Sequence, residues 1–174
     1  PVLQNQVTPA VLRIAVDVEA PAALLPGLRS NWATRAAWPG CRALPRARSR
    51  GRIDVLLFNT QLPALFSLDV MRRVPSLVTI DATPINFDEV GAAYGHRSPR
   101  GTPLDRLKHQ LNRGVFHAAR RLISLSEWAR RSLVDDYGVS SDRGTVLAAG
   151  ASAVYFEIGA ALAARAAAGA GASR

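Results

Sequence analysis

The chain has 174 residues, and its 48% hydrophobic content is enough to build one folded domain with a proper core. It contains no apolar run long enough to cross a bilayer and no recognisable signal peptide, and its single cysteine, Cys41, excludes an internal disulfide. The net charge is +9, and all but one of the 22 basic residues are arginine. Nucleic acid, an anionic membrane and a phosphorylated substrate would suit this charge, but a solvated arginine-rich surface is the simpler interpretation. No aromatic residues interleave with the basic ones, so we expect no specific nucleic-acid partner.

The first fifty residues carry weak signals. Residues 13–18 alternate between apolar and other side chains, which predicts a strand. Pro39 and Pro45 argue against one long helix, so the sequence predicts only a shorter helix between Leu28 and Trp38. The basic run that follows, residues 42–52, is predicted to be a solvated connection, with phosphate binding as the alternative.

Four short apolar runs then predict the strands of a sheet. Between the third and fourth runs lies one helical stretch, and strand, helix, strand at this spacing is a βαβ unit with parallel strands and a right-handed crossover. The predicted fold class is therefore α/β, a Rossmann-like open parallel sheet with helices on both faces. The predicted strands are Ile53–Phe58, Leu77–Ile80, Leu122–Leu125 and Thr145–Ala148.

Periodic apolar positions predict the helices between these strands. The first helix should bury Leu62, Leu65, Phe66 and Val70, and residues 85–101 are predicted to form a long loop. The next helix starts at Thr102-Pro103, a hydroxyl cap followed by proline, and should bury Leu104, Leu107, Leu111, Val115 and Ala118. The last helix starts at Ser126 and ends before Gly138, and it should bury Ala129, Leu133 and Tyr137.

Polar residues follow three of the predicted strands, and ligands of open parallel sheets bind beyond the carboxyl ends of the strands. The candidate binding residues are Asn59, Thr60, Gln61, Thr83, Ser126 and Glu127. Helix capping is an equally good interpretation of Asn59, Thr60 and Ser126. Asp81 is the candidate catalytic residue, because a carboxylate directly after an apolar strand needs a partner; the alternative is that it caps its own loop through neighbouring amides.

Other kinds of site find no support in the sequence. His96, His109 and His117 have no carboxylate or cysteine partners at metal-ligand spacing, so no metal is expected. No G-x-S-x-G, Walker or G-x-G-x-x-G pattern occurs, which removes the main support for hydrolase, nucleoside-triphosphatase and dinucleotide-binding functions. No cofactor is expected.

Three ordered stretches resemble the N-terminal domain of family 4 glycosyltransferases, which have the two-domain GT-B architecture. They are LVTIDATP (77–84), LKHQLNRGVFHAARRLISLS (107–126) and LISLSEWARRSLVDDYGVSSDRGTVLAAG (122–150). Where the family ends a strand with Pro-Gly, this chain has Ala149-Gly150. Where many members have a sugar-contacting histidine, it has Asp81, as in a subset with an Asp-Ala-Thr-Pro loop.

The resemblance implies a metal-independent hexosyltransferase-type enzyme that binds its acceptor in this domain. The acceptor would be a sugar or glycolipid, and a nucleotide-sugar donor would bind a second domain. The family's Glu-x7-Glu donor motif is absent, and the chain opens at Pro1, so we expect an inactive fragment. The implied location is cytoplasmic, with peripheral contact to anionic membrane as an option. The alternatives are a non-catalytic flavodoxin-like binding module and a basic nucleic-acid binder.

The resemblance and the composition together divide the chain into three parts. Residues 1–52 would be a partial N-terminal segment with a basic connection, and residues 53–152 the Rossmann-like acceptor-domain core. Residues 153–174 would form a peripheral alanine- and glycine-rich tail.

Overall fold

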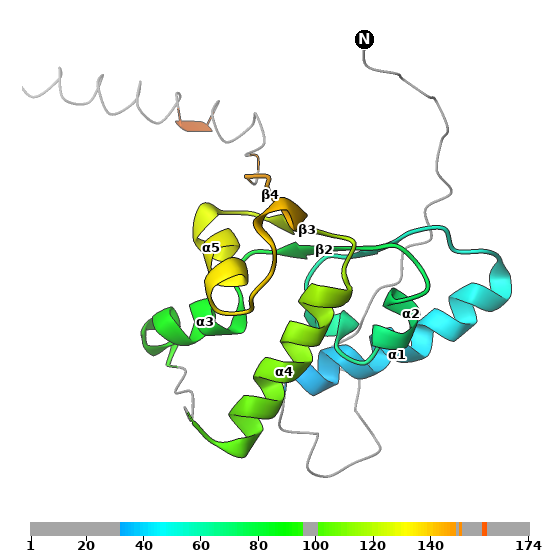
Figure 1. Ribbon diagram of the computed structural model, residues 1–174, viewed down its shortest axis with the longest axis horizontal. Coiled ribbons are helices and arrows are strands. Elements are labelled where there is room, and N and C mark those ends of the chain that lie inside the picture. Colours follow the sequence, from blue (N-terminus) through cyan, green and yellow to red (C-terminus); the bar gives the residue numbers. More distant parts are fainter. Residues whose placement is uncertain (1–31, 96–100, 149, 151–157, 160–174) are drawn as a thin grey trace, which may run out of the picture.

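A computed structural model describes residues 32–95, 101–148, 150 and 158–159, and its main body is a parallel sheet layered against helices (Figure 1). The predicted strand at 13–18 and nearly all of the predicted tail lie outside the described residues. The elements in chain order are α1 (Trp32–Arg50), β1 (Leu56–Phe58), η2 (Leu62–Ala64), α2 (Leu68–Met71), β2 (Ser76–Ile80), α3 (Pro84–Val90), η3 (Gly91–Tyr94), α4 (Pro103–Ala118), β3 (Arg121–Ser124), α5 (Glu127–Asp135), η4 (Ser141–Arg143) and β4 (Gly144–Val146).

The sheet confirms the predicted fold class, an α/β Rossmann-like open parallel sheet. Its four strands are hydrogen-bonded in the order β1-β2-β3-β4, and every neighbouring pair is parallel. The register places Leu57 beside Leu77, Val78 beside Leu122, and Ile123 beside Thr145. Each strand overlaps its predicted run, although β1 is shorter than the predicted 53–58.

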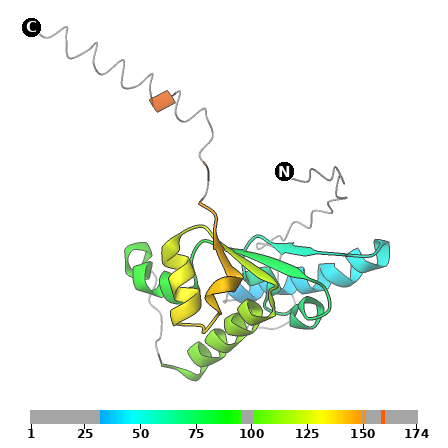
Figure 2. The ribbon, with the colours of Figure 1, turned by 45° about the horizontal axis from the view of Figure 1, so that its top comes forward.

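The described helices lie on one face of this sheet, where the prediction had placed helices on both (Figure 2). Each strand is followed by its immediate neighbour, always in the same direction across the sheet. Right-handed crossovers between neighbours that advance in one direction must all run over the same face. The exposures agree with this geometry, since Val78 and Leu122 are fully buried whereas Leu57, on the other face, is 67% exposed.

One hydrophobic cluster fills the space between the sheet and the helices. Ile80 and Leu122 contribute from the strands, and Val115 and Phe116 from α4. Tyr137, just beyond α5, packs its ring edge-on against Phe116 with the ring centres 4.8 Å apart. The strands, α4 and α5 therefore pack on one shared hydrophobic core, which fixes where the ends of the strands lie.

α1 continues through Pro39 and Pro45, so the prediction that these prolines break the segment was wrong. Each proline removes a helical hydrogen bond and costs about 3 kcal/mol in a helix interior. Tertiary packing offsets this cost, because α1 buries Ala36, Ala37, Leu44 and Ala47. At Gly40 the helix lies so close to η2 that an added Cβ would be 2.7 Å from the Pro63 carbonyl oxygen. Most of the arginines predicted to lie in a connection are therefore helical, although their side chains remain exposed.

Two predictions around α3 and α4 also need correction. The predicted loop at 85–101 contains α3 and η3, because Thr83-Pro84 starts a helix just as Thr102-Pro103 does. Leu104 and Leu107, predicted to be buried, are 61% and 55% exposed. The first turns of α4 extend beyond the core, and burial begins only in the second half of the helix, at Asn112, Val115 and Phe116.

α5 forms as the sequence predicts. Ala129, Leu133 and Tyr137 are almost fully buried, and the helix is closed by Gly138 at a φ of 65°. The Gly138 N–H donates to the Val134 carbonyl at 3.1 Å, which is the bond of the αL capping motif, and the Val139 N–H donates to the Leu133 carbonyl at 3.0 Å. A residue with a side chain would be strained at Gly138.

Candidate functional site

The predicted site residues follow the carboxyl ends of three adjacent strands. β1, β2 and β3 are parallel neighbours, so their carboxyl ends share one edge of the sheet. Asn59, Thr60 and Gln61 follow β1, Asp81 and Thr83 follow β2, and Ser126 and Glu127 lie after β3. We call this edge the strand-end edge.

Asp81 lies directly after β2 and is an exposed carboxylate of the strand-end edge. Its Oδ1 accepts a hydrogen bond from the Ala82 N–H at 2.8 Å. This is the loop-capping contact considered as the alternative to a catalytic role. The side chain nonetheless remains exposed, so the contact that fixes the carboxylate does not withdraw it from solvent. A fixed, accessible carboxylate can serve either role.

Thr83, two residues further on, is fully buried and holds the start of α3. Its Oγ1 accepts from the Asn86 N–H at 3.1 Å, and the Asn86 Oδ1 accepts from the Thr83 N–H at 3.2 Å. Together these bonds form a capping box. The same Oγ1 lies 2.6 Å from the Ser132 Oγ, and Ser132 donates to the Asp136 Oδ2 at 2.6 Å. The turn that carries Asp81 is thereby tied to α5.

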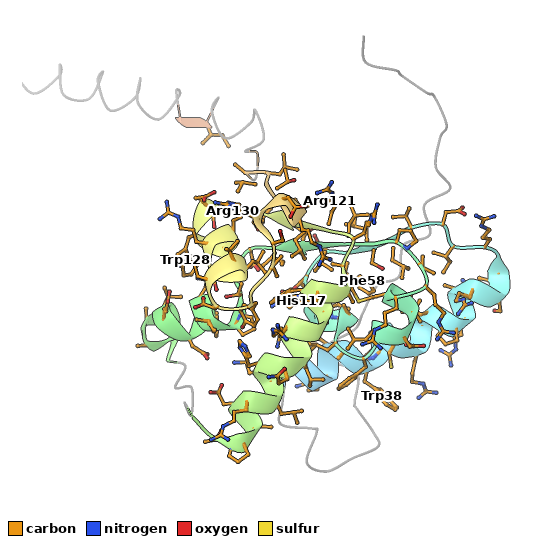
Figure 3. All side chains as sticks on the ribbon, in the orientation of Figure 1. Trp38, Phe58, His117, Arg121, Trp128 and Arg130 are labelled. Carbon is orange, nitrogen blue, oxygen red and sulfur yellow. The ribbon has the colours of Figure 1, made fainter. Side chains whose placement is uncertain are left out.

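Ser126 and Glu127 begin α5 at the end of the third strand. The Ser126 Oγ accepts from the Ala129 N–H at 3.2 Å, which confirms the capping interpretation of this serine. Glu127 pairs with Arg130 at 2.5 Å and lies 3.7 Å from Arg131. The hydrogen bonds from Arg130 hold the pKa of the Glu127 carboxyl below its usual value. Trp128 and Arg130 lie on the side of the domain opposite Trp38 of α1 (Figure 3).

The residues after β1 make fewer contacts. Asn59 is exposed, and the Thr60 hydroxyl donates to the Gln61 Oε1 at 3.0 Å. Gln61 is buried and stands at the start of η2 without a side-chain capping bond, so the structure does not bear out helix capping by Asn59 and Thr60.

Three polar residues escaped the sequence analysis although they organise this region: Asn86, Ser132 and Asp136. Asn86 carried a readable signal, because Thr-Pro-x-Asn places an amide at the third position of a helix behind a threonine cap. Ser132 and Asp136 carried none, since a serine and an aspartate four apart on a helix also suit a solvated face. Their role depends on the approach of α3 to α5, which local sequence does not encode.

A hollow of about 530 Å³ lies between α3 and α4, and none of the seven predicted site residues lines it. It begins at Pro84 and Ile85, directly after the turn that carries Asp81. In the ranges that the structure describes, no three His, Cys, Asp or Glu side chains group as metal ligands. Over the same ranges, no helix has the length and apolar character to cross a bilayer.

Two comparisons with known proteins bear on this arrangement. The family model described as Glycosyltransferase Family 4 matches residues 8–153, which include all four strands and the strand-end edge. A search of curated proteins finds no match.

Proposed function

The chain belongs to glycosyltransferase family 4, and on that premise we propose that it is the acceptor-side domain of an enzyme that transfers a sugar from a nucleotide-sugar donor. The family match over residues 8–153 is the observation that carries this proposal. The acceptor is a sugar or a glycolipid, and residues 53–152 form the core that holds it. The strand-end edge is the place for the acceptor, because open parallel sheets bind ligands at the carboxyl ends of their strands.

Asp81 is proposed to act on the reacting sugar. Charge that develops at the sugar in the transition state is stabilised by a fixed opposite charge, provided that the charged group does not have to reorganise. The bond from the Ala82 N–H and the anchored turn behind it hold the carboxylate in place. Asn59, Thr60, Gln61, Ser126 and Glu127 are proposed to contact the acceptor, and Thr83 to act mainly by holding the turn.

A second domain is proposed to carry the nucleotide-sugar donor, so that the 174 residues alone transfer no sugar. Transfer requires the donor phosphates and the acceptor to be held in line, and positioning of this kind supplies much of the rate of two-substrate reactions. The sequence lacks the Glu-x7-Glu pattern that the family uses for the donor. This proposal assigns the two substrates to two separate domains.

The basic face of α1 supports a further part of the proposal, peripheral contact with an anionic membrane on the cytoplasmic side. α1 contains five arginines and no acidic residue, and Arg42, Arg46, Arg48 and Arg50 are exposed. Trp38 is 36% exposed on the same helix, with the Arg42 guanidinium carbon 6.0 Å from its ring centre. Tryptophan beside arginine suits a lipid interface, where each basic residue contributes about 1 kcal/mol of attraction to anionic lipid.

The test compares the chain alone with the chain fused at Gly150 to the donor domain of a family 4 enzyme. Each is incubated with labelled nucleotide sugars and a panel of saccharide and glycolipid acceptors. We expect label in the acceptor only with the fusion. Transfer by the isolated chain would contradict the two-domain assignment. A folded fusion that hydrolyses or transfers nothing, with a donor domain active in its own parent, would count against the acceptor role.

A further inference from the structure

The hollow between α3 and α4 has the size and the construction of a small-molecule site. Its volume of about 530 Å³ falls in the range of roughly 300–1,000 Å³ that is usual for such sites. Pro84 and Ile85 line it from the start of α3, and His109 lines it from α4. Tyr137, two residues after the end of α5, completes this part of the lining. Three separate elements therefore converge on one concave surface.

The aromatic part of this wall is held rigidly. The His109 and Tyr137 rings are stacked, with their centres 4.6 Å apart and their planes 17° apart. Phe116 supports Tyr137 from the core in an edge-on contact, and Tyr137 is 1% exposed. Half-buried His109 is thus the ring that meets solvent in the hollow, and Tyr137 fixes its plane. A ring that is already fixed loses little freedom when a ligand binds.

The rest of the described lining is polar and carries charges of both signs. Asp88, Glu89 and Asp105 contribute carboxylates, and Arg106 and Lys108 contribute cations. Among the lining residues that the structure describes, these two cations and three carboxylates give a formal charge of −1. The Lys108 Nζ also lies 3.6 Å from the Asp88 Oδ1, so part of the positive charge is compensated locally. Such a rim does not attract a phosphate, but it offers many hydrogen-bond donors and acceptors side by side.

An uncharged ligand that is apolar on one face and rich in hydroxyl groups at its edge satisfies both parts of this lining. A pyranose ring has this form, with C–H bonds on a flat face and hydroxyls around it, each able to donate to a carboxylate and accept from a cation. We propose that the hollow between α3 and α4 binds an uncharged pyranose unit, with its apolar face on His109 and its hydroxyls on the charged rim.

This site is separate from the strand-end edge and goes beyond the proposed transfer reaction. None of the predicted site residues lines the hollow, so the proposal places a sugar there in addition to the one that reacts at the strand-end edge. Binding in the hollow and transfer at the strand ends are therefore tested independently, and either can fail without the other.

The experiment titrates the isotope-labelled chain with methyl α-mannoside, methyl α-glucoside and methyl β-galactoside, and follows backbone amide signals. We expect at least one glycoside to give saturable shifts at Ile85, Asp88, Glu89 and residues 106–110, with a dissociation constant in the millimolar range. His109→Ala should weaken binding at least tenfold, while His109→Phe, which keeps a stacked ring, should stay within a few-fold of the native chain. Glu89→Gln should weaken binding several-fold.

His117→Ala is the matched control, because His117 lies on the same helix and its Nε2 contacts the Tyr137 carbonyl oxygen, but it does not line the hollow. It should leave binding unchanged. The proposal is overturned if none of the three glycosides shifts these signals in the folded native chain. It is also overturned if His109→Ala and Glu89→Gln bind like the native chain, or if glucose 6-phosphate or inorganic phosphate binds the hollow more tightly than the methyl glycosides do.

Discussion

Two helix starts in this domain share one sequence pattern and differ in what surrounds them. Thr83-Pro84 begins α3 and Thr102-Pro103 begins α4, and both threonines cap their helices at nearly the same backbone angles. Thr83 is fully buried, and its hydroxyl also contacts Ser132 of α5, whereas Thr102 is half-buried. The third residue of α3, Asn86, accepts a hydrogen bond from the N–H of the capping residue Thr83. The third residue of α4, Asp105, instead accepts one from the N–H of Gly101, one residue before the cap.

The difference teaches that the local pattern creates the cap, and the packing around it decides how much the cap stabilises. At α4 the Thr102 hydroxyl caps the start of the helix through the Asp105 N–H. At α3 the capping residue Thr83 also contacts Ser132 of α5, so the turn that carries the candidate catalytic residue Asp81 is anchored to a second helix.

The largest loss of folding stability should come from removing the buried hydroxyl group of Thr83. Thr83→Ala loses a cap, which costs about 1 kcal/mol, and leaves buried polar partners unsatisfied, which costs about 1–3 kcal/mol more. Thr102→Ala should lose only about 1 kcal/mol. Urea unfolding of both variants measures the difference, and Thr83→Ser, which restores the hydroxyl, should recover most of the loss. Equal losses for the two alanine variants would refute the comparison.

The second effect is the coupling between the β2–α3 turn and α5. Thr83→Ala and Ser132→Ala remove the two ends of one 2.6 Å contact, so the double variant should lose less stability than the sum of the single variants. We expect a coupling of about 1 kcal/mol, in the range for residues that share a hydrogen-bond network. Thr102→Ala with Ser132→Ala is the control pair and should be additive. Additivity in both pairs would show that the turn is not anchored through Ser132.

The smallest change in stability should come from the start of α5, where Glu127 forms a surface ion pair with Arg130. The pKa of Glu127 is lowered by its bonds from Arg130, so its contribution to stability is present above the ordinary carboxyl pKa and is lost as pH falls through the lowered value. Glu127→Gln should therefore lower the melting temperature slightly near pH 7, and the difference from the native chain should vanish in strong acid. Arg130→Gln should show the same trend. A difference that persists in acid would mean that Glu127 acts through something other than this ion pair.

The sequence predicted the features that depend on neighbouring residues. The strands, the Thr102 and Ser126 caps and the Gly138 termination are local signals, and each appears in the structure. It missed what depends on distant contacts. The continuation of α1 through two prolines depends on its packing against Pro63, and the exposure of Leu104 depends on how far α4 extends beyond the core.

The candidate site divides in the same way. Asp81 and the other strand-end residues could be predicted from the sequence, because the carboxyl ends of parallel strands share one edge of the sheet. This holds whatever the orientation of the individual side chains. The link from the buried Thr83 to the buried Ser132, and from Ser132 to Asp136, required the packing of α3 on α5. The hollow required the same packing together with the position of α4, so no single stretch of sequence indicated it.

The most direct test of the acceptor role is to ask which of the two substrates this chain binds. Backbone amide signals are followed while a panel of saccharide and glycolipid acceptors, and separately a panel of nucleotide sugars, is added to the native chain and to Asp81→Asn. Asp69→Asn, which changes an exposed carboxylate on α2, is the control. The account predicts that an acceptor shifts the signals of Asn59, Asp81 and Ser126, that Asp81→Asn weakens these shifts while Asp69→Asn does not, and that nucleotide sugars leave them unmoved. Saturable binding of a nucleotide sugar at these residues, with no response to any acceptor, would contradict it.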